Sequence, residues 1–214
     1  MCVTTRTFFL GDWNPWIRDP IDVVRALLPA GALAFLLAGD SSGAILLAGA
    51  AALAWLVRPL QLPRAYDAAF MVALTLQAVG EALGAYDAIP WFDNITHFTL
   101  PFFLAPTLYI ALARADVVPD PKDETTTRHY VGIFVVCFAL GVALGGVWEI
   151  WEWVSDHSFG SSLQLGLDDT VGDLVADTAG SLCGALLLVC WARYGWRSVR
   201  RIPGENRYEA TEAG

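Results

Sequence analysis

Six apolar segments separated by short polar breaks cover most of the chain. They run over residues 22–38, 44–57, 66–86, 93–113, 129–154 and 169–193. A helix rises about 1.5 Å per residue, so about 20 residues cross a hydrocarbon core of about 30 Å. Four segments reach that length, the first is slightly short, and 44–57 is short enough to be tilted or only partly inserted. The pattern predicts an all-α, polytopic bundle of six transmembrane helices within residues 22–194.

The two ends of the chain differ from this core. Residues 1–21 mix charged side chains with Phe and Trp and contain no continuous apolar run, which is typical of a segment at the membrane interface. Residues 195–214 are polar and basic. We therefore expect an N-terminal interfacial segment, a six-helix domain and a cytoplasmic C-terminal tail.

Composition supports the membrane assignment and excludes other classes. Hydrophobic residues make up 56% of the 214 residues and charged residues only 16%, whereas a soluble domain carries about 25% charged residues. The mean hydropathy is +0.49. A formal net charge of −9 also makes a nucleic-acid binder a poor interpretation.

The positive charges predict an orientation. If all six segments span, the 13 Lys and Arg residues fall at the N-terminus, between the second and third spans, between the fourth and fifth, and after the sixth. All of these places are on one side of the membrane. The positive-inside rule makes that side cytoplasmic. We therefore expect a multi-pass protein of the inner (plasma) membrane with both termini in the cytoplasm.

Half of the acids lie on the opposite side of the predicted membrane, in outer loops or in the outer halves of spans. They are Asp40, Glu81, Asp87, Asp93, Glu149, Glu152, Asp156, Asp168, Asp169, Asp173 and Asp177. No Lys or Arg is available there to pair with them. Ionisable residues inside a membrane are costly and usually functional.

Helical spacing groups these acids further. Asp169, Asp173 and Asp177 follow an i, i+4, i+8 pattern, and Gly180 and Gly184 continue the same stripe. A second stripe on the fifth segment consists of Gly141, Gly145, Glu149 and Glu152. Because the two helices run antiparallel, we expect their glycines to meet in one half and their carboxylates in the other.

The fourth segment adds a histidine to this layer. Asp93 and His97 are one helical turn apart, and Glu81 on the third segment lies at a similar predicted depth. Asp93, Asp168 and Asp169 could instead be helix N-caps. That explanation does not fit Asp173 or Asp177, which lie deeper, nor two glutamates near the predicted helix end at residue 154, where the helix dipole disfavours negative charge.

Three motifs carry a resemblance to a known family. The runs Asp93-Asn-Ile-Thr-His97-Phe98, Trp148-Glu149-Ile-Trp-Glu152-Trp153 and Asp169-Thr-Val-Gly-Asp173-Leu-Val-Ala-Asp177-Thr-Ala-Gly180 resemble the YjdF-like family of uncharacterised bacterial inner-membrane proteins. The resemblance covers roughly residues 66–190. It implies a multi-pass fold and supports grouping the three motifs, but it implies no reaction.

One histidine among several carboxylates is an oxygen-rich ligand set, which suits a divalent ion such as Mg²⁺, Mn²⁺, Fe²⁺, Ca²⁺ or Zn²⁺. The first hypothesis is a metal-dependent hydrolase that acts on a membrane lipid or another membrane-associated substrate. In it, Glu152 or Asp169 takes a proton from metal-bound water. The candidate metal ligands are His97, Glu149, Asp173 and Asp177, with Asp93 and Glu81 as further members.

Two other functions stay open. The same layer could be the binding site of a cation- or proton-coupled transporter, although the inner halves of the third to sixth spans offer mainly glycine, alanine, Thr75 and Thr107, and no inverted repeat is evident. Alternatively, the acidic face could serve a non-catalytic assembly or sensing protein. Side chains that converge within metal-ligand range would favour the first two hypotheses.

Overall fold

The structure is a computed structural model of the whole chain. It describes residues 17, 19–60, 62–115, 117–121, 126–160, 163–164 and 166–194. Most of the predicted interfacial segment (1–21) and the whole predicted C-terminal tail (195–214) therefore lie outside the described residues, and both stay predictions.

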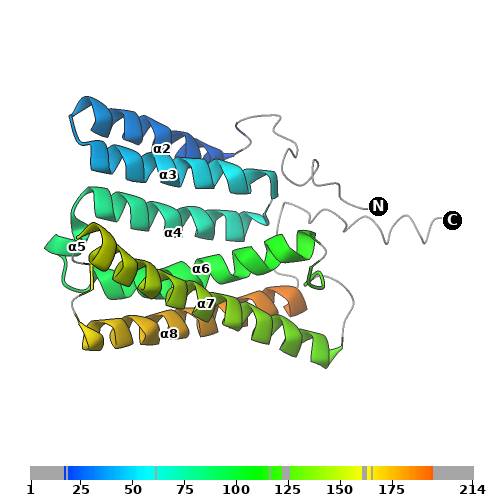
Figure 1. Cartoon of the computed structure of the whole chain (residues 1–214). Coiled ribbons are helices and arrows are strands. Elements are labelled where there is room, and N and C mark those ends of the chain that lie inside the picture. The colour runs from blue at the N-terminus through cyan, green and yellow to red at the C-terminus, as the bar shows by residue number, and fades with distance from the viewer. Residues whose placement is uncertain are drawn as a thin grey trace. The chain divides into compact units, whose positions relative to one another are not determined.

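The described residues form seven α-helices and one 3-10 turn, with no strand among them. In chain order these are α2 (Pro20–Leu37), α3 (Ser41–Val57), η1 (Arg58–Leu60), α4 (Arg64–Ala82), α5 (Ala85–Ala88), α6 (Phe92–Arg114), α7 (Thr127–Phe159) and α8 (Leu167–Tyr194). The prediction of an all-helical fold is confirmed for this part of the chain (Figure 1).

The chain divides into two compact units. The first comprises Met1–Ala85, Ile110–Lys122 and Arg197–Gly214, and the second comprises Tyr86–Tyr109 and Asp123–Trp196. In the first unit, α3 packs against both α2 and α4. Asp19 caps α2 by accepting a hydrogen bond from the Ile21 amide, and Pro20 begins the helix, where its missing N–H costs nothing.

In the second unit, α7 and α8 pack along each other (Figure 1). The 33-residue α7 is about 50 Å long, well beyond the thickness of a hydrocarbon core. It ends at Phe159 and is capped by Gly160, whose φ of 70° is the left-handed conformation that glycine adopts most easily.

Glycines allow close approach in the second unit, but not in the predicted arrangement. A Cβ on Gly141 or Gly145 would run into Ser181 or Asp177 of α8, whereas a Cβ on Gly180 or Gly184 would run into backbone carbonyls of α6. The expectation that the glycines of α7 and α8 meet one another is therefore wrong. Each stripe faces a different neighbour, because α8 is close to α7 and to α6 at the same time.

Five helices among the described residues are long and apolar enough to cross a membrane: α2, α3 continued by η1, α6, α7 and α8. The predicted short segment 44–57 becomes a stretch of 20 residues, Ser41–Leu60. The 19-residue α4 is not among the five, because Asp67, Gln77 and Glu81 lower its apolar content. A membrane helix bundle is supported, while the sixth span and the orientation stay predictions.

Candidate functional site

The candidate site is a cluster of one histidine and five carboxylates in the second unit. We name it the His97 cluster and define it as Asp93 and His97 on α6, Glu149 and Glu152 on α7, and Asp173 and Asp177 on α8. Each helix contributes two members at a spacing of three or four residues, so each pair shares a helix face. The predicted convergence of these three motifs is present in the structure.

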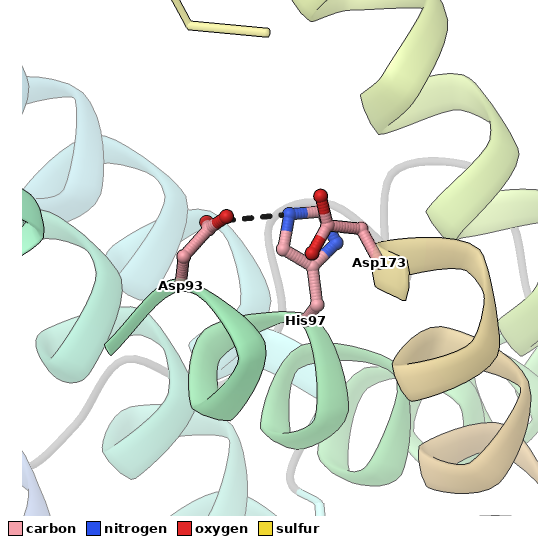
Figure 2. Close-up of side chains that lie close together, drawn as sticks. All are labelled: Asp93, His97 and Asp173. Carbon is pink, nitrogen blue, oxygen red and sulfur yellow. Dashed lines mark ion pairs between the residues drawn. The ribbon is translucent and has the colours of Figure 1, made fainter. Parts of the chain in front are cut away.

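His97 is the centre of the cluster. Its Nε2 lies 3.5 Å from Oδ1 of Asp93, and its Nδ1 lies 3.4 Å from Asp177 and 3.8 Å from Oε1 of Glu149. Figure 2 shows the carboxylate of Asp93 facing the imidazole, with the carboxylate of Asp173 overlapping the ring in this view. Both ring nitrogens therefore face acidic oxygens, although a neutral imidazole has only one N–H to donate.

Most of the cluster is buried. His97, Glu149, Glu152, Asp173 and Asp177 are all less than 10% exposed, whereas the side chain of Asp93 is 36% exposed. The cluster is therefore closed on most sides, with Asp93 as its more accessible member.

Two overlapping sets of ligand atoms lie close enough to share a small cation. One set is Asp93, His97 and Asp173, and the other is His97, Glu149 and Glu152. In each set the candidate ligand atoms are within 4.8 Å of one another. His97 is the one residue that belongs to both sets.

One carboxylate oxygen has an unusual environment. Oε1 of Glu149 is buried, and among the described residues it accepts no hydrogen bond. Its nearest recorded polar neighbour is the imidazole of His97, at 3.8 Å. A buried polar atom without a hydrogen bond is costly, so Glu149 is an energetically unfavourable member of the cluster.

The second unit contains little positive charge to balance these acids. Arg128 and Arg193 are its only Lys or Arg residues. They lie at the start of α7 and the end of α8, which puts them about 24 Å or more along their helices from Glu149 and Asp177. Within the second unit, no Arg or Lys side chain on α7 or α8 is close enough along its helix to compensate the charge of the His97 cluster.

Sequence reasoning missed several polar side chains that hold the acids in place. Nε1 of Trp148 donates to Oε1 of Glu152 at 2.7 Å, and the amide of Asn94 lies 3.5 Å from Oδ1 of Asp173. Trp148 lies one turn before Glu152, a spacing that could have indicated the contact. The sequence contains no comparable signal for the pair on α6 and α8.

Gln164 also went unnoticed because it lies in the connection between α7 and α8. Its side-chain amide donates to the backbone oxygen of Glu149 at 3.3 Å, to Oε2 of Glu149 at 3.4 Å and to the hydroxyl of Thr170 at 3.3 Å. The carboxylate of Asp156 fixes this loop by accepting from the amides of Leu163 and Gln164. The loop thus orients one of the candidate ligands.

The remaining candidates are placed differently. Asp169 is half-buried in the first turn of α8, one turn before Asp173 on the same face. Glu81 is exposed on α4 and belongs to the first unit, so its membership of the site stays a prediction. The helix-end argument for Glu149 and Glu152 is wrong, because α7 continues to Phe159 and the dipole effect is confined to the last turn.

A second buried ionic cluster lies in the first unit and was not predicted. Arg25 on α2 pairs with Asp22, 2.7 Å away, and with Asp67 on α4. It also donates to the backbone oxygen of Ala54 at 3.2 Å, and Nε of Arg58 lies 3.4 Å from Asp22. With two arginines and two aspartates, this group balances its own charge, which indicates a structural role. The sequence offered only the i, i+3 spacing of Asp22 and Arg25.

Comparisons with known proteins identify the family. Residues 28–194 match the model of the family described as predicted membrane protein (DUF2238). A protein of Thermotoga maritima described as uncharacterized is 30% identical over 124 residues, which cover 56% of this chain and 59% of that protein. The chain thus spans less than two thirds of the length of this relative. No solved structure matches. The match over most of the chain, including all three motifs of the site, shows that the protein belongs to the DUF2238 family of membrane proteins.

Proposed function

We propose that the His97 cluster binds a divalent cation and uses it to hydrolyse a membrane-associated substrate. The observation that carries the proposal is the position of His97: carboxylates from three helices lie 3.4 to 3.8 Å from its ring nitrogens, so either nitrogen could share an ion with the acids on its own side. Nitrogen and oxygen ligands bind such ions at about 2.0–2.2 Å, so two ligands of one ion are roughly 3.0–3.5 Å apart. The spacing in the cluster is close to this separation.

Charge supports the same conclusion. Five carboxylates surround a single histidine, and ions removed from water must be paired or neutralised. A divalent ion would neutralise two carboxylates and give the buried Oε1 of Glu149 a partner. The mixed oxygen and nitrogen donor set suits Mn²⁺, Fe²⁺ or Zn²⁺, and Mg²⁺ or Ca²⁺ if carboxylates dominate.

The proposed reaction assigns a role to each group. His97 with Asp93, Asp173, Asp177 or Glu149 would hold the ion, which lowers the pKa of a bound water. Glu152, within 4.8 Å of the ligand atoms of His97 and Glu149, would accept the proton of that water. When bound, the ion would also polarise the scissile carbonyl, and Glu152 would pass the proton to the leaving oxygen or nitrogen as its bond to the carbonyl carbon breaks. Asp169, more exposed and one turn from Asp173, is the alternative base.

The chemistry of the site favours an ester or amide of a lipid or lipid-linked group over a phosphate. A phosphate would be repelled by the carboxylates, and in the second unit Arg128 and Arg193 lie at the far ends of their helices. Arg and Lys are the usual partners of phosphate groups. A neutral carbonyl needs no such partner, because the ion alone can polarise it.

The packing beside the cluster favours a hydrolase over a transporter. Gly141 and Gly180 lie against Ser181 and the backbone of Phe98, with no room for a Cβ atom. Transport requires an open path past the binding site. The tight contacts between α6, α7 and α8 leave little room for such a path beside the cluster, which supports a site that is open on one side only. Uptake of a divalent cation into liposomes would reverse this preference.

The test begins with metal analysis of the protein purified in detergent without added chelator. We expect about one divalent ion per chain and a lower melting temperature after treatment with EDTA. Readdition of the ion at a hundredfold excess over its Kd should restore about 2.7 kcal/mol. Protein without a stoichiometric ion, and with no response to any added divalent ion, would contradict the proposed site.

Matched variants localise the effect. His97→Gln and Asp173→Asn should abolish metal-dependent stabilisation, while Asp168→Asn should keep it, because Asp168 is an exposed residue in the first turn of α8. Hydrolysis is tested separately with ester and amide lipids in mixed micelles, as release of fatty acid. Metal binding without turnover of any of these lipids would contradict the hydrolase and leave a binding or transport protein.

We also propose six spans with both termini in the cytoplasm of a bacterial inner membrane. Five candidate spans and a 19-residue α4 support this topology, as does the distribution of the 13 basic residues. A C-terminal fluorescent-protein fusion should be bright, and alkaline phosphatase inserted after residue 160 should be active. A dark C-terminal fusion with inactive phosphatase would contradict the orientation. A chain with five spans would have its two termini on opposite sides of the membrane.

A further inference from the structure

A groove lies between α7 and α8, near the start of α7 and the end of α8. It is lined by Thr127, Tyr130, Val131, Phe134, Leu186, Val189 and Arg193. Its volume of about 360 Å³ is within the range of small-molecule sites, about 300–1,000 Å³. All seven lining residues belong to the second unit, and none is a member of the His97 cluster.

The lining is divided into an apolar part and a polar part. Val131, Phe134, Leu186 and Val189 supply hydrocarbon surface, and two of these side chains are strongly exposed, with Val131 at 56% and Leu186 at 50%. Thr127, Tyr130 and Arg193 supply two hydroxyls and a guanidinium. Because Thr127 begins α7 and Arg193 is the penultimate residue of α8, the polar groups lie toward the helix ends.

Positive charge in the second unit is concentrated at this end. The second unit has two Lys or Arg residues. Arg193 lines the groove, and Arg128 follows the lining residue Thr127 in the sequence. The carboxylates of Glu149 and Asp177 lie about 24 Å or more from these arginines along α7 and α8. The guanidinium of Arg193 lies 5.6 Å from the ring centre of Tyr194, and its planar array of donors is well suited to a phosphate.

We propose that this groove binds an anionic phospholipid, with one acyl chain against the apolar residues and the phosphate at Arg193, Tyr130 and Thr127. Both α7 and α8 are long and apolar enough to cross a membrane, and in the proposed topology such helices are in contact with lipid. Charge complementarity selects an anionic headgroup, because a single guanidinium with two hydroxyls offers donors and no balancing carboxylate among the lining residues. The proposal is independent of the function of the His97 cluster.

The test compares two lipids with identical acyl chains, phosphatidylglycerol and phosphatidylcholine, added to the delipidated protein in detergent. Thermal unfolding should shift upward with phosphatidylglycerol and much less with phosphatidylcholine. Arg193→Gln should raise the apparent Kd for phosphatidylglycerol about tenfold or more, since it removes a charge-assisted hydrogen bond. Arg128→Gln is the matched control, because Arg128 is exposed and does not line the groove.

A second variant tests the acyl-chain part. Val131→Trp should fill the groove without disturbing the interior, because Val131 is more than half exposed, and it should also abolish the phosphatidylglycerol shift. Equal shifts with both lipids, or an undiminished shift in Arg193→Gln, would overturn the proposal. Co-purification of a protein in the groove, displaced by neither lipid, would overturn it in favour of a protein partner.

Discussion

The carboxylate of Asp177 on α8 occupies the space in which residue 145 of α7 would carry a Cβ atom, so Asp177 and Gly145 fit together only because residue 145 is glycine. The same carboxylate lies 3.4 Å from Nδ1 of His97. This contact between two helices therefore fixes where an acid of the His97 cluster stands.

Replacing that glycine tests the contact. Gly145→Ala should push Asp177 away from His97, cost about 1–3 kcal/mol of stability through overpacking and weaken cation binding. Gly146→Ala is the matched control, because a Cβ there meets nothing within 4 Å and alanine favours a helix more than glycine does. Thermal unfolding and metal titration of both variants measure the difference. Equal stability and affinity in the two variants would show that the contact is unimportant.

The close approach of α8 to α6 gives a second prediction. A Cβ on Gly180 would collide with the carbonyl of Phe98, one residue after His97, and backbone cannot turn aside as a side chain can. We expect Gly180→Ala to destabilise the protein by about 1–3 kcal/mol and to reduce the yield of folded protein in detergent. Gly172→Ala on the same helix has open space and should behave as the wild type.

The apolar segments were sufficient to predict the long helices, and helical spacing was sufficient to pair acids that share a helix face. The segments 93–113 and 169–193 correspond closely to α6 and α8, and spacing correctly grouped Asp173 with Asp177 and Asp93 with His97. Those relations are local, because residues one turn apart share a face of a helix. Convergence of the three motifs followed from the antiparallel order of the spans.

Relations between distant residues could not be predicted in this way. Arg25 and Asp67 are 42 positions apart, and Gln164 contacts Glu149 through a loop. Neither pair follows from a periodic pattern. The glycine stripes show the same limit. Helical spacing correctly predicted a close contact on each stripe, but it could not show whether Gly180 of α8 would face α6 or α7.

The hydrogen bond from Trp148 to Glu152 gives a third prediction. Trp148→Phe keeps an aromatic ring but removes the N–H that lies 2.7 Å from Oε1 of Glu152. Because Glu152 is the proposed base, loss of its supporting partner should lower activity 10- to 100-fold, measured as the rate of lipid hydrolysis, while metal affinity stays close to that of the wild type. Trp153→Phe is the control, because the Trp153 side chain is 52% exposed and its ring is tilted against that of His157, with ring centres 4.2 Å apart. A matching loss in both variants would indicate a general effect of aromatic area.

The last prediction concerns Arg25 and Asp67, which are both buried in the first unit. Removing one partner leaves the other charge uncompensated, so Arg25→Met or Asp67→Leu alone should cost about 3–5 kcal/mol of stability. The double variant should cost clearly less than the sum, because apolar side chains of similar volume can replace a buried pair. Arg64→Met is the control: its pairing with Asp19 is long, at 3.7 Å, and Arg64 is 48% exposed, so the change in stability should stay within about 1 kcal/mol.

Metal affinity should not change in any of these variants, since Arg25 and Asp67 balance their own charge and belong to a different unit from the His97 cluster. Additive single costs would show that the two side chains do not stabilise the unit as a pair.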